Sequence, residues 1–191
     1  MEMHLEKEGM MSLVFEQEQL RRQLAASATE VLETMFFSSV EELQQELLDS
    51  DRGERIGAYL DFHGACAGRL ALSLEKDAAR NLATSFFGET FEGAEDEDCS
   101  SVMAELTNMV CGAMLSHLDR NSIFCLASPE ALGDGEDAEG DIVRLLLEDG
   151  LLRLAFSLDQ ALACNALSSA RKPVVSFGKV SKPAAFTMLW R

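Results

Sequence analysis

The chain has few cations for its length, no long apolar run and no closely spaced pair of cysteines. Its 16 Lys and Arg stand against 33 Asp and Glu, for a formal net charge of -17 at pH 7, and the cations form no cluster. Nucleic-acid binding draws on clustered Lys and Arg, so this class of partner is excluded. No segment approaches the roughly 20 apolar residues that cross a bilayer, which argues against a membrane span.

The five cysteines are odd in number, widely spaced and without a Cys-x-x-Cys pair. Such cysteines are typical of free thiols in a reducing compartment. The first residues, Met-Glu-Met-His-Leu-Glu-Lys-Glu, have neither the basic leader nor the continuous apolar segment of a secretory signal. Together these features predict a cytoplasmic protein.

Familiar metal and nucleophile motifs are also missing from the sequence. His4, His63 and His117 are isolated, and no carboxylate or cysteine stands at ligand spacing from more than one of them, so no metal site is predicted. Gly-x-Ser-x-Gly is absent. Residues 64–68, Gly-Ala-Cys-Ala-Gly, lack the Lys-Ser/Thr that completes a phosphate-binding loop, and we interpret them as a tight turn between strands.

The first half of the chain alternates between helical and strand patterns. At 191 residues and 47% hydrophobic composition, one folded domain is expected. Residues 14–48 have apolar positions at helical spacing, which predicts one long helix or two helices broken near Ser38 and Ser39. Period-two patterns over 55–75 predict a strand pair. Residues 77–87 form a short amphipathic helix ended by Gly88.

The second half supplies the remaining strands. Residues 123–127 are a short apolar strand, and two alternating runs in 141–158 are separated by Asp149-Gly150, a strong hairpin signal. We therefore expect an α/β (α+β) domain in which long helices cover one face of a largely antiparallel sheet built from 55–75, 122–128 and 141–158.

The C-terminal end is a different kind of segment. Residues 159–169 have weak helical spacing, whereas 171–191 hold two of the three prolines and five basic residues without an acidic one. This last segment either adds an edge strand through Val174, Val175 and Phe177 or forms a basic tail.

The most informative stretch is residues 101–112, Ser-Val-Met-Ala-Glu-Leu-Thr-Asn-Met-Val-Cys-Gly. Positions three and four apart are neighbours on a helix surface. One stripe is therefore polar or small and comprises Ser101, Glu105, Asn108 and Gly112. The apolar stripe for packing lies opposite and comprises Val102, Leu106, Met109, Val110 and Ala113. Four acids, Glu95-Asp-Glu-Asp98, precede this helix, where the positive end of its dipole favours them and Asp98 can cap free N–H groups.

A solvated helix face is the plain alternative, since Glu-x-x-Asn pairs arise by chance. However, Asn108 has a low helix propensity, and Gly112 lowers helix stability by about 1 kcal/mol relative to Ala. Other residues at these two positions would give a more stable helix. Ala104, Cys111 and Gly112 are small and leave the stripe open to another protein's surface. We therefore favour Glu105 and Asn108 as the candidate catalytic pair.

These residues resemble the CheC/CheX/FliY phosphatases of bacterial chemotaxis and flagellar switching. The family signature is Asp or Ser, three residues, Glu, two residues, Asn and a later Pro, which here reads Ser101, Glu105, Asn108 and Pro129. Residues 31–36, Val-Leu-Glu-Thr-Met-Phe, resemble the family's first helix, and the Gly64/Gly68 strand pair resembles its β-hairpin. The likeness spans about residues 24–160.

CheC carries a second Glu-x-x-Asn on its first helix, whereas this chain has Glu30-Val-Leu-Glu33 in that region, with no amide. The chain is similar to single-site CheX in that respect. The resulting organisation is an N-terminal helical extension over 1–23, a CheX/CheC-like phosphatase domain over 24–170 and a basic C-terminal extension over 171–191.

The resemblance implies hydrolysis of the aspartyl phosphate on a CheY-like response regulator, in chemotaxis or another two-component pathway. The regulator would bring its own Mg²⁺ and lysine, so the chain needs no cofactor. Asn108 would orient the attacking water, and Glu105 would engage the regulator's lysine in a charge-assisted contact. Ser101, Ala104 and Gly112 would line the docking surface. CheX-like relatives also imply a homodimer.

Two other classes of function use the same residues. A non-catalytic regulator-binding or switch module would dock through the same helix and leave the phosphate in place. A general dimeric scaffold would carry the Glu-x-x-Asn pair as mere surface.

Overall fold

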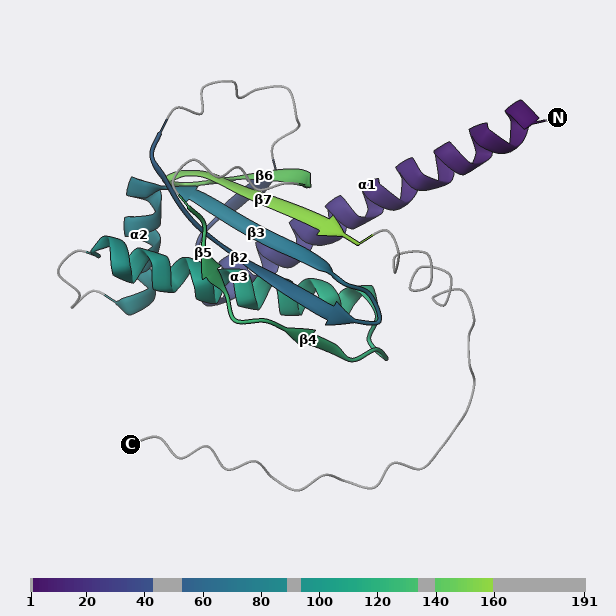
Figure 1. The fold of residues 1–191 in the computed structure, drawn as a ribbon. Coiled ribbons are helices and arrows are strands. Elements are labelled where there is room, and N and C mark those ends of the chain that lie inside the picture. The colour runs from purple at the N-terminus through teal and green to yellow at the C-terminus, as the bar shows by residue number, and fades with distance from the viewer. Residues whose placement is uncertain (1, 43–52, 89–93, 134–139, 160–191) are drawn as a thin grey trace.

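The computed structural model describes residues 2–42, 53–88, 94–133 and 140–159 (Figure 1). It describes side chains from residue 17 onward within these ranges, except that of residue 42. The predictions made for residues 43–48, 160–169 and 171–191 lie outside the described residues. No described helix is long and apolar enough to span a membrane.

Three helices and seven strands make up the described chain. The helices are α1 (Glu2–Met35), α2 (Lys76–Phe87) and α3 (Asp96–Leu118). The strands are β1 (Val40–Glu42), β2 (Arg55–Gly64), β3 (Gly68–Glu75), β4 (Phe124–Leu126), β5 (Glu130–Ala131), β6 (Asp141–Leu147) and β7 (Gly150–Leu158). The predicted strand pair, the short helix before Gly88 and the hairpin at Asp149-Gly150 are confirmed.

The break expected near Ser38 and Ser39 lies just after the end of the first helix, but the helix starts well before residue 14, and residues 40–42 are a strand where a second helix was expected. The helix begins at Glu2 and ends at Met35, and the chain then turns through Phe37, which has a positive φ of 54°. Beyond Ser38 and Ser39 the chain forms strand β1, which pairs antiparallel with β6. The helical spacing of the sequence could not show this, because β1 is selected by the edge of β6, a partner about a hundred residues away.

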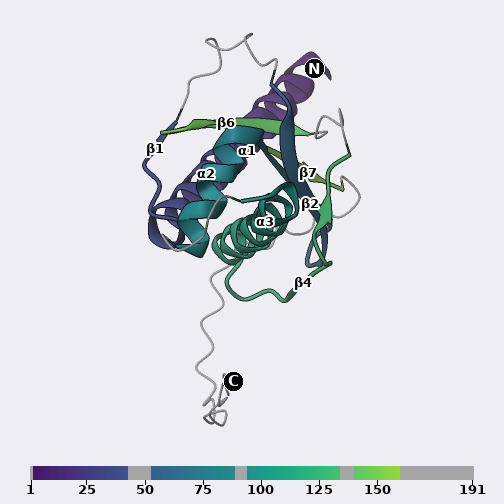
Figure 2. The same ribbon diagram turned by 90° about the vertical axis from the view of Figure 1, so that its left-hand side faces the viewer.

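The sheet has the strand order β1-β6-β7-β3-β2-β4, with β5 also pairing with β2. Every strand pair is antiparallel. Figure 2 shows the three helices gathered on one side of this sheet. The expected α/β architecture, with helices on one face of an antiparallel sheet, is therefore confirmed.

The register places one apolar row under the helices. Leu72 in β3 lies between Ala58 in β2 and Leu154 in β7, and Leu154 in turn pairs with Val143 in β6. All four are buried, with Leu72 and Leu154 completely enclosed. Because successive side chains of a strand point to opposite faces, this register turns every second residue of the central strands into the core.

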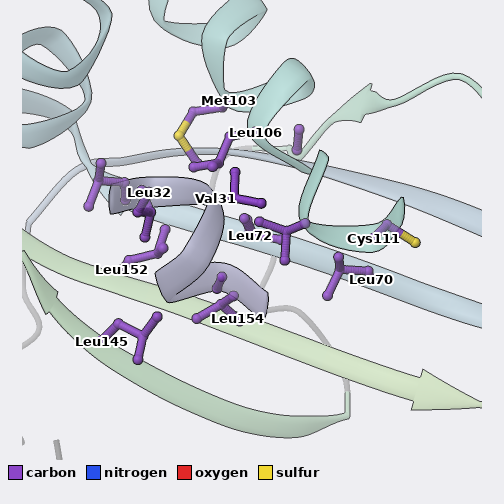
Figure 3. Packing of buried hydrophobic residues seen from close by; sticks show 14 of the residues in the cluster. Val31, Leu32, Leu70, Leu72, Met103, Leu106, Cys111, Leu145, Leu152 and Leu154 are labelled. Carbon is purple, nitrogen blue, oxygen red and sulfur yellow. The ribbon is translucent and has the colours of Figure 1, made fainter. Parts of the chain in front are cut away.

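The core is a single cluster shared by the sheet and all three helices. Figure 3 shows side chains of α1 and α3 meeting those of the strands. Its labelled members are Val31, Leu32, Leu70, Leu72, Met103, Leu106, Cys111, Leu145, Leu152 and Leu154. One cluster of this kind fixes these helices against the same sheet face.

Truncating the centre of this cluster should destabilise the whole fold. We expect Leu72→Ala to lower the free energy of unfolding by about 2–5 kcal/mol, because the lost methyl groups leave a cavity. Leu146→Ala, on the opposite face of the sheet and only partly buried, is the matched control. Urea unfolding followed by circular dichroism measures both. Equal losses in the two variants would contradict the assignment of the core face.

Candidate active site on helix α3

Helix α3 is held on the sheet by one buried side that is apolar except for Thr107. It packs mainly against β2 and α1. Its buried residues recur at helical spacing and are Cys99, Val102, Met103, Leu106, Thr107, Val110, Cys111, Met114 and Leu115. Thr107, the polar member of this set, donates its hydroxyl to the carbonyl of Met103 at 2.7 Å. The helix therefore cannot rotate about its axis without exposing this side to water.

The start of α3 is anchored by charge. Asp96 accepts from Lys76 Nζ at 2.7 Å and from Arg80 Nη2 at 3.0 Å, and both cations belong to α2. The hydrogen bond from Lys76 is the main reason that the pKa of Asp96 lies below its ordinary value. These contacts join the first turns of α2 and α3 and set where along its axis α3 lies.

The predicted cap of α3 needs a correction. Asp98 is already inside the helix, whose first residue is Asp96, and the N-cap is Glu95. Asp98 Oδ2 accepts from the backbone N–H of Glu95 at 3.0 Å. The acidic run is a helix start, as expected, but Asp98 satisfies the cap residue's own N–H and so fills the third helical position of a capping box.

The outward stripe is confirmed by the burial of its members. Ser101 and Glu105 are exposed, and Asn108 and Gly112 are half-buried. The Ser101 hydroxyl donates to the carbonyl of Glu97 at 2.9 Å, so it is occupied by its own helix. Within the part of the chain that the structure describes, the Glu105 carboxylate and the Asn108 carboxamide have no hydrogen-bond partner. Both groups remain available to a molecule outside this chain.

One residue expected on the open side of the helix lies elsewhere. Cys111 is completely buried and belongs to the core, because it follows Thr107 one turn later on the packing side. Met109 and Ala113, expected on the packing side, are only half-buried. Ala104 is also half-buried. Met109 and Ala113 nevertheless pack against the core, as expected, so the expectation that was wrong is the one for Cys111.

Gly112 lies in open space. A Cβ atom built on it would meet no heavy atom within 4 Å, so the chain's own packing does not demand glycine there. Gly112 also borders a groove between the end of α3 and β4. Sequence patterns did not reveal this groove, because its other wall comes from a turn and a strand that follow the helix.

Pro129, the last member of the family signature, lies half-buried between β4 and β5. In the described ranges, no group of three or more His, Cys, Asp or Glu could hold a metal ion. The candidate site consists of the Glu105 carboxylate and the Asn108 carboxamide on helix α3.

This arrangement defines a class of protein before any comparison: a helix-on-sheet domain whose helix α3 has an outward Glu-x-x-Asn pair. Residues 56–139 match the family model described as "Chemotaxis phosphatase CheX". That range includes the whole of α3 and Pro129. Over this part of the chain, which is less than half of its length, the sequence is similar to the CheX family.

Solved structures show the same fold. The chemotaxis protein CheX of Desulfovibrio desulfuricans is 19% identical, with a TM-score of 0.59 over 74% of this chain and 99% of that one. CheX of Vibrio vulnificus is 20% identical, with a TM-score of 0.59 over 75% and 98%. A CheX-CheY-BeF3-Mg complex of Borrelia burgdorferi is 15% identical, with a TM-score of 0.56 over 73% and 97%. None of the curated protein sequences matches this chain.

The thiol nearest the stripe is expected to be inert. Burial raises the pKa of Cys111 to about 12, so it is protonated at neutral pH and cannot act as a nucleophile. Cys125, on β4, is exposed. With a thiol-reactive dye at pH 8, we expect Cys125→Ser to remove one fast-reacting thiol and Cys111→Ser to remove none. Loss of a fast-reacting thiol in Cys111→Ser would contradict the burial of this residue.

Proposed function

We propose that this chain is a phosphatase that hydrolyses the aspartyl phosphate of a CheY-like response regulator. The observation that carries the proposal is the pair of outward groups on α3, Glu105 and Asn108, whose polar ends have no partner among the described residues. A buried helix side fixes them, so they are preorganised for a partner's site. The match of residues 56–139 to the family model described as "Chemotaxis phosphatase CheX" supports the same reaction.

The reaction needs placement more than new chemistry. A water molecule attacks the phosphorus, and the bond between phosphorus and the aspartyl oxygen breaks. The aspartate carboxylate stays on the regulator, and inorganic phosphate, which has gained the oxygen and protons of the water, is released. In the proposed complex, Asn108 accepts from or donates to this water and holds it in line with the breaking bond. The Asn side chain has one carbonyl oxygen and one NH₂, so it can contact the water and a phosphoryl oxygen together.

Glu105 has a different part in the proposal. It forms a charge-assisted hydrogen bond with the regulator's lysine and fixes how the two proteins dock. Mg²⁺ is held by the regulator and not by this chain, and it supplies charge stabilisation at the phosphoryl group. Ser101, Ala104 and Gly112 line the docking surface around the pair.

The homodimer implied by CheX-like relatives and the cytoplasmic location expected from the sequence are part of this proposal. A symmetric dimer would present the same helix twice.

The catalytic assignment is tested by the decay of phosphorylated regulator. We expect Asn108→Ala to reduce the acceleration about 100-fold, because loss of one positioned group costs about 2–3 kcal/mol of transition-state stabilisation. Glu105→Ala should act mainly on docking and raise KM. Asn81→Ala, which replaces an exposed amide on α2, is the matched control and should accelerate decay of the phosphorylated regulator as much as wild type does.

If Asn108→Ala accelerates this decay as much as wild type, the proposed mechanism is contradicted. Binding of the regulator by wild-type protein without faster decay would favour a non-catalytic docking module.

Gly112 gives a second test, in which stability and activity move in opposite directions. We expect Gly112→Ala to raise the free energy of unfolding by about 0.5–1 kcal/mol, because alanine is the better helix former and its Cβ has room. The same methyl group should raise KM for the phosphorylated regulator, since it occupies space on the docking surface. Asn81→Ala should add helix stability without changing KM. An unchanged KM in Gly112→Ala would place this residue outside the contact.

A further inference from the structure

A groove of about 650 Å³ begins where the stripe of α3 ends. Its lining residues come from the end of α3, the following turn and β4; they are Gly112, Leu115, Ser116, His117, Asp119, Arg120, Ser122, Ile123, Phe124 and Leu126. Gly112 belongs to both features, so the groove and the stripe form one continuous surface. Gly112 lies one helical turn, about 6 Å along the helix axis, beyond Asn108.

The turn before β4 holds an apolar side chain out at this groove. Asp119 accepts from the backbone N–H of Asn121 at 2.9 Å and from the Ser122 hydroxyl at 2.5 Å. β4 is in turn paired with β2, with Phe124 opposite Gly64. Ile123, between the braced turn and the strand, has 83% of its surface exposed. Because both flanks are fixed, Ile123 loses little conformational freedom when a partner covers it.

A protein that docks at Asn108 is expected to contact this groove, because protein interfaces are larger than the Glu-x-x-Asn pair. A specific complex covers about 800 Å² on each partner, which is a patch of roughly 16 Å radius. A regulator that places its phosphoryl group at Asn108 therefore contacts far more than the Glu-x-x-Asn pair. Ser116, two turns along the helix, lies only about 12 Å from Asn108 along the axis.

Charge favours the groove over the other end of α3. The first turn of the helix exposes Glu95 and Glu97, which have no ion pair among the described residues and repel a phosphorylated surface, whereas Asp96 is paired with Lys76 and Arg80. The groove has one carboxylate, Asp119, which accepts hydrogen bonds within its own turn, and the exposed Arg120, which has no ion pair among the described residues. On a chain with a net charge of -17, this is the end of the helix where an anionic partner meets least repulsion.

We infer that the phosphorylated regulator docks along the C-terminal half of α3 and into this groove, with Ile123 as its apolar anchor. This inference rests on the proposed phosphatase function, and it assigns to Ile123 a role in binding and none in bond breaking. The residue lies beyond the Glu-x-x-Asn motif, so the motif itself does not identify it.

The test is a split between KM and kcat in regulator dephosphorylation. We expect Ile123→Asp to raise KM for the phosphorylated regulator at least 10-fold while kcat stays within twofold of wild type. Ile123→Leu should restore KM to near wild type. Phe37→Asp is the matched control, because Phe37 is 88% exposed and does not line the groove, and its KM should not change. Thermal unfolding of each variant checks that the fold is kept.

The outcomes separate this inference from the proposed function. If wild type accelerates decay and Ile123→Asp has an unchanged KM, the docking inference falls and the phosphatase function stands. If wild type binds the regulator without accelerating decay, and Ile123→Asp weakens that binding 10-fold, docking is supported and catalysis is not. If Ile123→Asp instead changes the sedimentation of the isolated protein and not KM, the groove belongs to a contact between copies, which overturns the inference.

Discussion

The structure depends on the burial of one side of helix α3 against the sheet and α1. Nine residues of that helix are buried, and several of them, such as Met103 and Leu106, are completely enclosed. Rotating the helix by even one residue would expose part of this side and bury Glu105 or Asn108 without partners, which costs free energy in both ways. The packing of the core thus determines which groups of α3 face outward. The burial that stabilises the fold also positions Glu105 and Asn108.

Electrostatic contacts add to the packing of the helix at its N-terminal end. Asp96 is bridged to Lys76 and Arg80 of α2, and Asp98 closes the cap on Glu95. These charges lie at the N-terminal end, where the helix dipole favours acids. The acidic end is therefore used for structure, and the groove lined by Gly112 and β4 lies at the other end of the helix. One helix keeps its structural and functional charges at separate places.

The outward stripe contains residues that a helix would not choose for stability. Asn108 and Gly112 both lower helix propensity, and the space around Gly112 shows that no neighbour in the chain requires a glycine. Proteins retain such residues where activity needs them, and stability is then supplied by the rest of the molecule. Here it comes from the shared core of the sheet and the three helices.

The sequence alone determined the local features: the strand pair before Glu75, the hairpin at Asp149-Gly150, and the outward placement of Glu105 and Asn108. These follow from periodicity and turn chemistry, which act over a few residues. Only the tertiary structure decided that β1 is a strand, that Cys111 is buried and that a groove adjoins Gly112. Each of these depends on segments far apart in the chain, and the contact between such segments leaves no periodic trace in either one.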